Sequence, residues 1–302
     1  MIDDPLVGET LTLTQGASTC DLLPRLGGSI AAWTVHGQAM MRPTNGADIA
    51  VRDSFATAGF PLVPFSNRVN AARFEWNRKV LTLAPNFPPE PHAIHGVGFE
   101  RPWQVHARSD NSVLLELRHR PDSGWPWSFD ARQRITLADD ALTLDLSATN
   151  LEGTPVPLAI GHHPYFPRSG ARLTFYAEGV WLSGDDGLPS ERVTPSGIFD
   201  FSKGASVERA DIDHCYSGWG RAAYVVWPDK PHALEISASP ELTYAVVYAD
   251  AGLDEFCFEP VAHMNDALSR HGTELFMPVV APGESFAASI RFRAVRRQAQ
   301  QR

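Results

Sequence analysis

Two adjacent histidines stand between a glycine and a proline in the segment Ile160–Phe166, IGHHPYF. Side chains of an extended strand alternate between its two faces, so His162 and His163 would point in opposite directions. One imidazole could then face a pocket while the other forms hydrogen bonds within the scaffold. Catalysis, metal ligation and a purely structural role are all open for this pair on the residues alone.

One carboxylate, Glu259, interrupts the apolar run from Phe256 to Val261. Ionised carboxylates rarely enter such runs without a partner. Burial would raise the pKa of this carboxyl, and a neighbouring cation or hydrogen-bond donor would lower it again, which is how a general base is tuned. The alternative is a glutamate at a strand end, capped by local backbone.

Two further places carry candidate ligand contacts. Asn67 and Arg68 lie inside the otherwise apolar, proline-bounded segment GFPLVPFSNRV, where an arginine costs free energy unless it is paired. Arg68 is therefore either half of a structural ion pair or a ligand contact. His95 follows the Pro-rich loop APNFPPEPH and precedes Gly96, which would let the backbone approach a ligand closely. A histidine in a surface turn is the alternative there.

Strands must position these side chains, because alternation with a period of two outweighs helical periodicity. Every second residue is apolar in Leu142–Thr149, and the preceding QRITL joins it through Ala-Asp-Asp, a hairpin signature. The C-terminal stretch SFAASIRFRAV repeats the pattern, with Phe286, Ala288, Ile290 and Phe292 on one face. Similar short runs are SVLLELRH, AAYVVWP, ALEISAS and TYAVVYAD. Only short helices are expected, for example around NDALSR (residues 265–270).

Numerous short strands separated by turn signals predict an all-β fold, a large antiparallel β-sandwich with few short helices. The 23 glycines and 24 prolines are spread along all 302 residues, so we expect a single domain over 1–302. The polar, basic tail, residues 296–302, is expected to be disordered.

Charge and composition narrow the class of partner. A formal net charge of -9 argues against nucleic acid and anionic lipid as partners. A secretory leader and a membrane-spanning apolar run are not apparent in the sequence, so we expect a soluble, cytoplasmic protein, either a monomer or a homodimer. Cys20, Cys215 and Cys257 are odd in number and lack zinc-site spacing, so they are expected to be buried, reduced thiols.

Four segments, PFSNRV, IHG, HHPYF and FEP, occur in this order and together resemble the aldose 1-epimerase (galactose mutarotase) family. The matching region runs from about Gly59 to Ala267, and the strand-rich flanks are compatible with the same fold. The resemblance implies a β-sandwich of the supersandwich type with an open cleft on one sheet for a sugar. Relatives often carry N-H-x-Y-F-N-L, whereas this chain has His162 before His163 and Pro167-Arg168 after Phe166. The departure bears on sugar identity more than on the reaction.

The same resemblance implies roles for six residues. His163 maps onto the general acid and Glu259 onto the general base. The implied substrate-binding residues are Asn67, Arg68, His95 and Asp213, the last in the segment DIDHCY. Tyr165 could form a floor for the apolar face of the sugar, whereas Phe166 is assigned to core packing.

The implied reaction interconverts the α and β anomers of a free aldose. Glu259 would remove the proton of the C1 hydroxyl while His163, as imidazolium, protonates the ring oxygen, so that the pyranose opens. Rotation about the C1–C2 bond before closure yields the other anomer. No metal and no organic cofactor is needed. His163 must be protonated near neutral pH, which a nearby carboxylate could encourage by raising its pKa.

Three alternatives stay open at this stage. A metal-dependent enzyme could use His95, His163 and Glu259 as a two-histidine, one-carboxylate site. A sugar-binding protein on the same fold could have lost catalysis, although both His163 and Glu259 are retained. A hexose-6-phosphate 1-epimerase would need basic residues for the phosphate, for which Arg68, Arg73 and Arg168 lie near the motifs.

Overall fold

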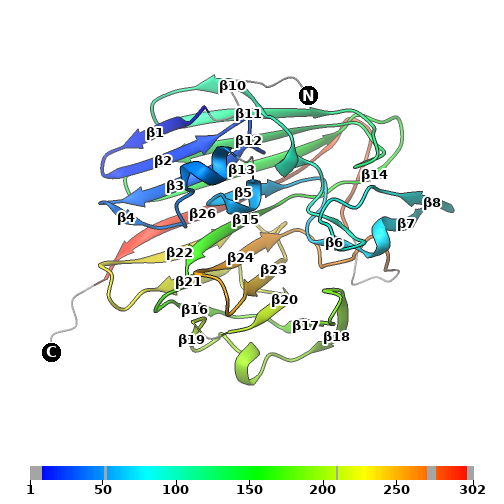
Figure 1. The fold of residues 1–302 in the computed structure, drawn as a ribbon. Helices are drawn as coiled ribbons and strands as arrows, with labels where there is room; N and C mark the ends of the chain where they lie inside the picture. The colour runs from blue at the N-terminus through cyan, green and yellow to red at the C-terminus, as the bar shows by residue number, and fades with distance from the viewer. Residues whose placement is uncertain (1–8, 51–52, 209, 271–276, 298–302) are drawn as a thin grey trace.

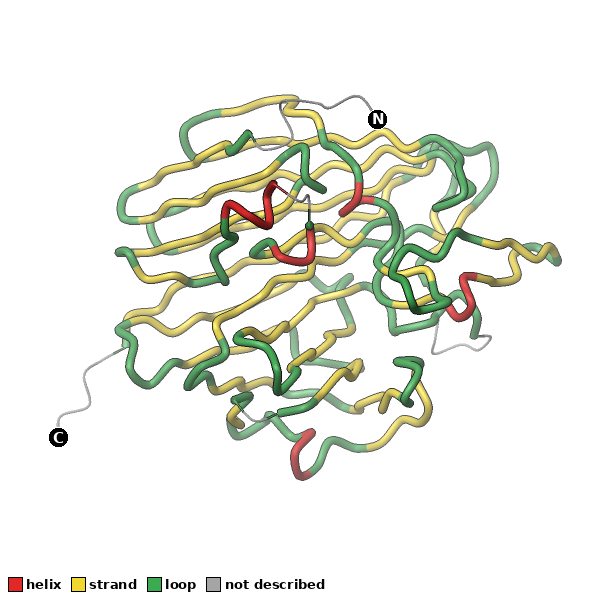
Figure 2. The backbone as a smooth tube through the Cα atoms, in the orientation of Figure 1, coloured by secondary structure: helices red, strands yellow, loops and turns green. Residues whose placement is uncertain are grey.

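The structure, a computed structural model, describes residues 9–50, 53–208, 210–270 and 277–297. Strands dominate the described chain and helices are short (Figure 2). The helical segments are α1 (Gly46–Ala50) and the 3-10 turns η1 (Ser54–Ala56), η2 (Asn70–Ala72), η3 (Gly98–Glu100) and η4 (Gly197–Phe199). Among the described residues, no helix has the length and apolar character needed to cross a bilayer. The predicted all-β class is confirmed.

Two large antiparallel sheets form the layers of the sandwich (Figure 1). The eleven-stranded sheet has the order β1 (Leu11–Gln15), β2 (Ser18–Leu23), β3 (Ser29–Val35), β5 (Gly59–Leu62), β15 (Gly161–Pro167), β24 (Glu255–Val261), β23 (Tyr244–Ala249), β20 (Ile212–Ser217), β17 (Gly179–Ser183) and β18 (Pro189–Val193), with β4 (Gln38–Ala39) paired to β3. The nine-stranded sheet has the order β10 (Gln104–Arg108), β11 (Ser112–His119), β12 (Phe129–Leu137), β13 (Ala141–Asn150), β26 (Ser285–Arg296), β22 (His232–Ala238), β21 (Ala222–Val226), β16 (Arg172–Phe175) and β19 (Ala205–Ser206).

Three two-stranded pairs complete the fold on the described residues. They are β6 (Arg68–Val69) with β9 (Ala93–Ile94), β7 (Arg73–Trp76) with β8 (Lys79–Thr82), and β14 (Val156–Pro157) with β25 (Val279–Val280). The first pair joins the SNR and IHG segments, since Arg68 lies opposite Ile94. Two motifs separated by the Pro-rich loop thus become neighbours.

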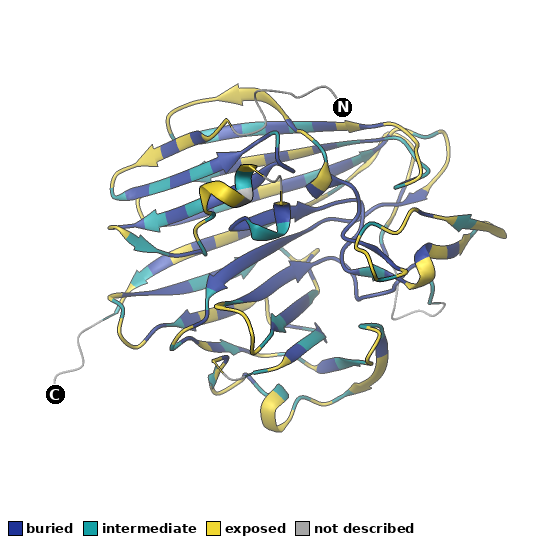
Figure 3. Cartoon of the chain, viewed as in Figure 1, coloured by how far each residue is buried: buried dark blue, intermediate teal, exposed yellow. Residues whose placement is uncertain are grey.

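The core lies between the two large sheets, and the alternation read from the sequence explains it. Leu144 of β13 lies opposite Ile290 of β26, and both side chains are fully buried. Phe292 of the same strand packs against Trp33 of β3 in the other sheet, with ring centroids 6.4 Å apart. Buried residues accordingly alternate with less buried ones along many strands (Figure 3). The three cysteines are buried free thiols, as expected.

Two local expectations differ from the structure. Residues 265–269 form a turn and not a helix. The expected disorder of the tail does not begin at residue 296, because Arg296 is the last residue of β26 and the Arg297 guanidinium donates hydrogen bonds to the carbonyls of Trp227, Pro228 and Lys230. Residues 298–302 lie outside the described part of the chain.

Candidate active site

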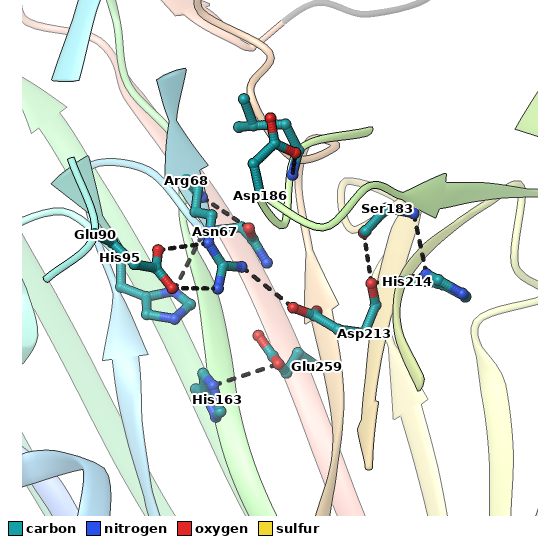
Figure 4. Close-up of polar contacts among 11 residues, drawn as sticks. Asn67, Arg68, Glu90, His95, His163, Ser183, Asp186, Asp213, His214 and Glu259 are labelled. Atoms are coloured by element: carbon teal, nitrogen blue, oxygen red, sulfur yellow. Dashed lines mark hydrogen bonds and ion pairs between the residues drawn. The ribbon is translucent and has the colours of Figure 1, made fainter. Parts of the chain in front are cut away.

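His163 of β15 and Glu259 of β24 meet on the outer face of the eleven-stranded sheet (Figure 4). These strands are direct neighbours, with Gly161 opposite Val261 and Tyr165 opposite Cys257, so position 163 falls beside position 259. The Nε2 atom of His163 lies 3.4 Å from Oε1 of Glu259. The two residues are 5% and 2% exposed, so the pair is largely removed from water.

Burial governs the protonation of this pair. It lowers the pKa of His163 well below the ordinary value of 6.5, and the neighbouring His95 adds to the effect. It also raises the pKa of Glu259 well above 4.5, helped by the charge of Asp213 and opposed by Arg68. The expectation that a carboxylate would raise the pKa of His163 is therefore wrong, because desolvation outweighs attraction. Both shifts favour the uncharged pair, a neutral imidazole beside a protonated carboxyl.

His95 is buried and lines the cleft, so it is not a histidine of a surface turn. The backbone N–H of Asn67 donates to its Nδ1 at 3.1 Å, so the ring hydrogen sits on Nε2. Burial, with a contribution from Arg68, lowers the pKa of His95 to about 3. Its ring centroid lies 5.0 Å from that of His163. His95 is thus a neutral hydrogen-bond donor placed next to the acid/base pair.

Arg68 is both an ion-pair partner and a lining residue of the cleft. Its guanidinium donates two parallel hydrogen bonds to the carboxylate of Glu90, at 2.8 and 2.9 Å, and one to Asp213 at 3.2 Å. The bonds from Arg68 hold the pKa of Glu90 below its usual range. Figure 4 shows Arg68 between these two carboxylates, above the His163–Glu259 pair. The ion-pair reading of Arg68 is confirmed, and its position in the lining leaves a ligand contact as a prediction.

A second group of side chains builds the floor beside the pair. Tyr165 stacks on His163, with ring centroids 4.7 Å apart and an interplanar angle of 27°. The guanidinium of Arg42 lies over the Tyr165 ring at 3.9 Å and donates hydrogen bonds to Glu255 and to the carbonyls of Phe55 and Thr57. Tyr165 lines the cleft, although it is only 5% exposed and both His163 and Arg42 pack on its ring.

Two other aromatic and imidazole side chains of β15 belong to the interior. Phe166 is fully buried against Phe256 and Phe292, as the core assignment predicts. His162 points away from His163, also as predicted, but both of its ring nitrogens lack a hydrogen-bond partner. The expected scaffold hydrogen bonds are therefore wrong. Burial lowers the pKa of His162 to about 3, which keeps the ring neutral.

The His163–Glu259 pair lies in a cleft of about 430 Å³. All six residues assigned from the sequence line it, namely Asn67, Arg68, His95, His163, Asp213 and Glu259. Sequence reasoning missed the other polar and apolar members of the lining, which are Arg42, Asp53, Phe55, Phe87, Ile94, Tyr248, Leu253 and Glu255. The alternation of β24 could have pointed to Glu255, since residues four apart on a strand share a face.

The structure also places the residues of the alternative hypotheses. In the described part of the chain, His163, Cys257 and Glu259 form a group in which one ligand atom from each lies within 4.8 Å of the others. The metal site considered from the sequence had His95 in place of Cys257, so it differs from this group. Arg73 is exposed and not among the lining residues, and Arg168 is buried with its guanidinium bonded to three backbone carbonyls.

Comparison with known proteins places these features in a family. A sequence model of the aldose 1-epimerases matches residues 9–293. The uncharacterized Escherichia coli protein YphB is 32% identical over 93% of this chain and 97% of its own length. A crystal structure of a candidate aldose 1-epimerase from Escherichia coli K12 superposes with a TM-score of 0.87 at 30% identity, covering 95% of this chain and 99% of that one. Galactose 1-epimerase from Lactobacillus acidophilus has the same fold, with a TM-score of 0.78 at 17% identity and coverage of 96% and 95%.

Proposed function

The chain belongs to the aldose 1-epimerase family, and from this premise we propose that it interconverts the α and β anomers of a free aldose. The observation that carries the proposal is the 3.4 Å approach of His163 Nε2 to Glu259 Oε1 at the floor of a sugar-sized cleft. Opening a pyranose requires that one group removes the proton of the C1 hydroxyl and another protonates the ring oxygen. A buried imidazole and carboxyl that share one proton supply both groups.

The reaction requires the shared proton to be on His163, so binding of the sugar has to transfer it there from the carboxyl of the free pair. Glu259 takes the proton of the C1 hydroxyl, the C1–O5 bond breaks, and its electron pair accepts the proton of His163. The products are the open aldehyde, a neutral imidazole and a protonated carboxyl. Those are the protonation states that burial favours in the free pair. Burial of the pair therefore favours the protonation states that accompany the open-chain intermediate.

Ring closure reverses the proton transfers on the other face of C1. After rotation about C1–C2, His163 removes the proton of the C5 hydroxyl and Glu259 returns one to the aldehyde oxygen. The chain ends in its starting state, so no oxidant, reductant or leaving group is involved. Each positioned proton transfer contributes about 10² to 10⁴ in rate.

The remaining side chains have roles in binding. His95 would donate its Nε2–H to a sugar oxygen near His163, since Asn67 already occupies Nδ1. Asp213 would accept a sugar hydroxyl, held in place by Arg68. Tyr165 would contact the C–H face of the ring. Asn67 and Arg68 contribute by positioning His95 and Asp213.

Charge in the cleft supports a neutral sugar over a phosphorylated one. Two cations, Arg42 and Arg68, line it together with the carboxyl groups of Asp53, Asp213, Glu255 and Glu259. Both guanidinium groups are already paired, Arg42 with Glu255 and Arg68 with Glu90 and Asp213. A phosphate would meet excess negative charge and no free cation among the described lining residues.

The test follows anomeric proton signals by NMR after pure α-anomers are dissolved with the protein. The panel contains glucose, galactose, a pentose and the 6-phosphates of both hexoses. We expect faster equilibration of at least one free sugar and of neither phosphate. Acceleration confined to the phosphates would favour the hexose-6-phosphate 1-epimerase instead.

Variants of the pair test the mechanism. Glu259→Gln and His163→Asn are each expected to slow the equilibration by about 100-fold or more, because each removes one proton transfer. Glu235→Gln and His106→Asn, on the nine-stranded sheet, serve as matched controls for the same chemical changes. Circular dichroism verifies that all four variants are folded. Full activity in both pair variants would show that the assigned roles are wrong.

A further inference from the structure

A cysteine side chain lies beside the His163–Glu259 pair and has no role in the proposed reaction. Cys257 is on β24 two residues before Glu259, so both side chains project from the same face of the strand. Its neighbours across the sheet are Tyr165 on β15 and Tyr248 on β23, two residues that line the cleft. The thiol is free and fully buried.

These three side chains offer nitrogen, oxygen and sulfur donors at short range. One ligand atom of each lies within 4.8 Å of the others, and the Nε2–Oε1 distance is 3.4 Å. Metal–ligand bonds of about 2.0 to 2.3 Å in a tetrahedral zinc site place donor atoms roughly 3.3 to 3.8 Å apart. The longest separation therefore has to shorten by about 1 Å when a metal binds.

Unused bonding capacity in the same place is an independent sign of a ligand. The Oε2 atom of Glu259 and the Nδ1 atom of His163 are buried and have no hydrogen-bond partner. A buried carboxylate oxygen without a partner is costly, and burial favours the protonated form of the group. A bound cation would compensate the charge of the ionised carboxylate and of the thiolate.

We propose that the floor of the cleft is an inhibitory site for a thiophilic divalent cation of the Zn²⁺ class. His163 Nε2, the Glu259 carboxylate and the Cys257 thiolate are its ligands, and the fourth position opens into the cleft. Thiolate and imidazole favour Zn²⁺ over Mg²⁺ or Ca²⁺, which prefer oxygen donors. The bound ion occupies both proton-transfer groups, so it excludes catalysis while it remains. This inference goes beyond the proposed function, because cation binding does not depend on which sugar is turned over.

Binding is tested without any measurement of activity by titrating the full-length protein with Co²⁺, a spectroscopic substitute for Zn²⁺. We expect a thiolate-to-cobalt charge-transfer band in the near ultraviolet that Zn²⁺ displaces. Cys257→Ser should abolish the band, whereas Cys215→Ser should retain it. Cys215 is a matched control, because it is an equally buried thiol of the same sheet outside the three-residue group. Absence of the band in the wild type, or its persistence in Cys257→Ser, would overturn the proposal.

A second variant guards against misfolding of Cys257→Ser. His163→Asn retains the thiol but removes the nitrogen ligand, and it should weaken Co²⁺ binding by about ten-fold or more. Unchanged Co²⁺ affinity in this variant would mean that the cation binds elsewhere.

Inhibition is tested in metal-buffered solution, with each variant compared to its own rate in the presence of a chelator. Half-inhibition of Cys257→Ser should require about ten-fold more free Zn²⁺, or a greater excess, than the wild type or Cys215→Ser. Equal inhibition of all three proteins, or loss of activity on chelation, would contradict an inhibitory site at Cys257. If no sugar is turned over, the proposed function fails while the cobalt band still decides the cation site.

Discussion

The imidazoles of His162 and His163 are adjacent in sequence and experience different surroundings. His163 has a carboxyl partner, two aromatic rings packed against it and access to the cleft. His162 contacts Phe292 of the opposite sheet and is fully buried without a polar partner. Burial lowers the pKa of both, but only the first can exchange a proton with a ligand.

His162 should therefore make the protein sensitive to acid. Above its ordinary pKa of 6.5 the ring is neutral in the folded and unfolded chains alike. Between pH 6.5 and about pH 3 the unfolded chain binds a proton that the folded chain does not. The free energy of unfolding therefore decreases by about 1.4 kcal/mol for each unit by which the pH is lowered. His162→Leu removes this term, and its stability advantage over the wild type should grow by about 2 kcal/mol from roughly pH 7 to pH 5.

Urea denaturation at a series of pH values measures that difference. Phe166→Leu, a change on the same face of the same strand without a titratable group, should keep a constant difference from the wild type. If the His162→Leu difference is also constant with pH, His162 has the same pKa in both states and the account of its burial fails.

Site residues could be predicted from the sequence when their chemical type differs from that of the residues around them. Glu259 and Arg68 are charges within apolar runs, and both were found in this way. Arg42 and its partner Glu255 are 213 residues apart, so the sequence around either residue does not indicate the other. The direction of the His163 pKa shift was also out of reach, because it depends on how completely the fold excludes water from the pair.

At the scale of elements, several segments meet at Arg68. Glu90 comes from the Pro-rich loop and Asp213 from β20. The turn between β17 and β18 adds Gly187, which has a φ of +70° and lies so close that a Cβ atom would be 2.6 Å from the Arg68 Cζ. The absence of a side chain at 187 thus lets Arg68 bond its two carboxylates.

Gly187→Ala should therefore weaken substrate binding. The added methyl group displaces the guanidinium from Asp213, and loss of about one hydrogen bond to a charged group should raise KM by roughly ten-fold. Gly197→Ala is the matched control, because Gly197 also has a positive φ of +57° but a Cβ there would meet nothing within 4 Å. Initial-rate kinetics across sugar concentrations measure KM for both. Equal KM values in the two variants would mean that the contact with Arg68 has no influence on binding.

The strands could be predicted individually, but one expected helix could not be distinguished from a turn. In residues 265–270 the backbone N–H of Asp266 donates to the Arg68 carbonyl, and the Asp266 carboxylate accepts from the Asn70 N–H. Asp266 also has a φ of +56°, which a right-handed helix does not allow. These contacts join segments about 200 residues apart, so a short local pattern carries no trace of them.

For the whole molecule, the two sheets have separate tasks. The cleft is lined from strands of the eleven-stranded sheet, from β6 and β9 and from loops. The nine-stranded sheet supplies the other wall of the core. Alternation was enough to predict this class of fold, whereas the order of strands was not, because pairs such as β13 with β26 join distant parts of the chain.

This division predicts that stability and activity respond separately to changes in the nine-stranded sheet. Leu144→Ala removes a fully buried side chain opposite Ile290 and should lower the free energy of unfolding by about 2 to 5 kcal/mol. The rate per folded molecule should not change, because the cleft is built on the other sheet. Urea denaturation and the NMR assay, run at a temperature where the variant is folded, check the two halves. A parallel loss of turnover would contradict the separation.

The alternation of cleft-facing and interior-facing side chains along β15 and β24 has a consequence for the evolution of the protein. Positions 163, 165, 255 and 259 line the cleft, whereas 162, 166, 256 and 258 face the interior. We therefore expect neighbouring codons of the gene to be under different selection. Proteins of this fold can then come to accept new ligands through changes at every second position, while the intervening positions preserve the architecture.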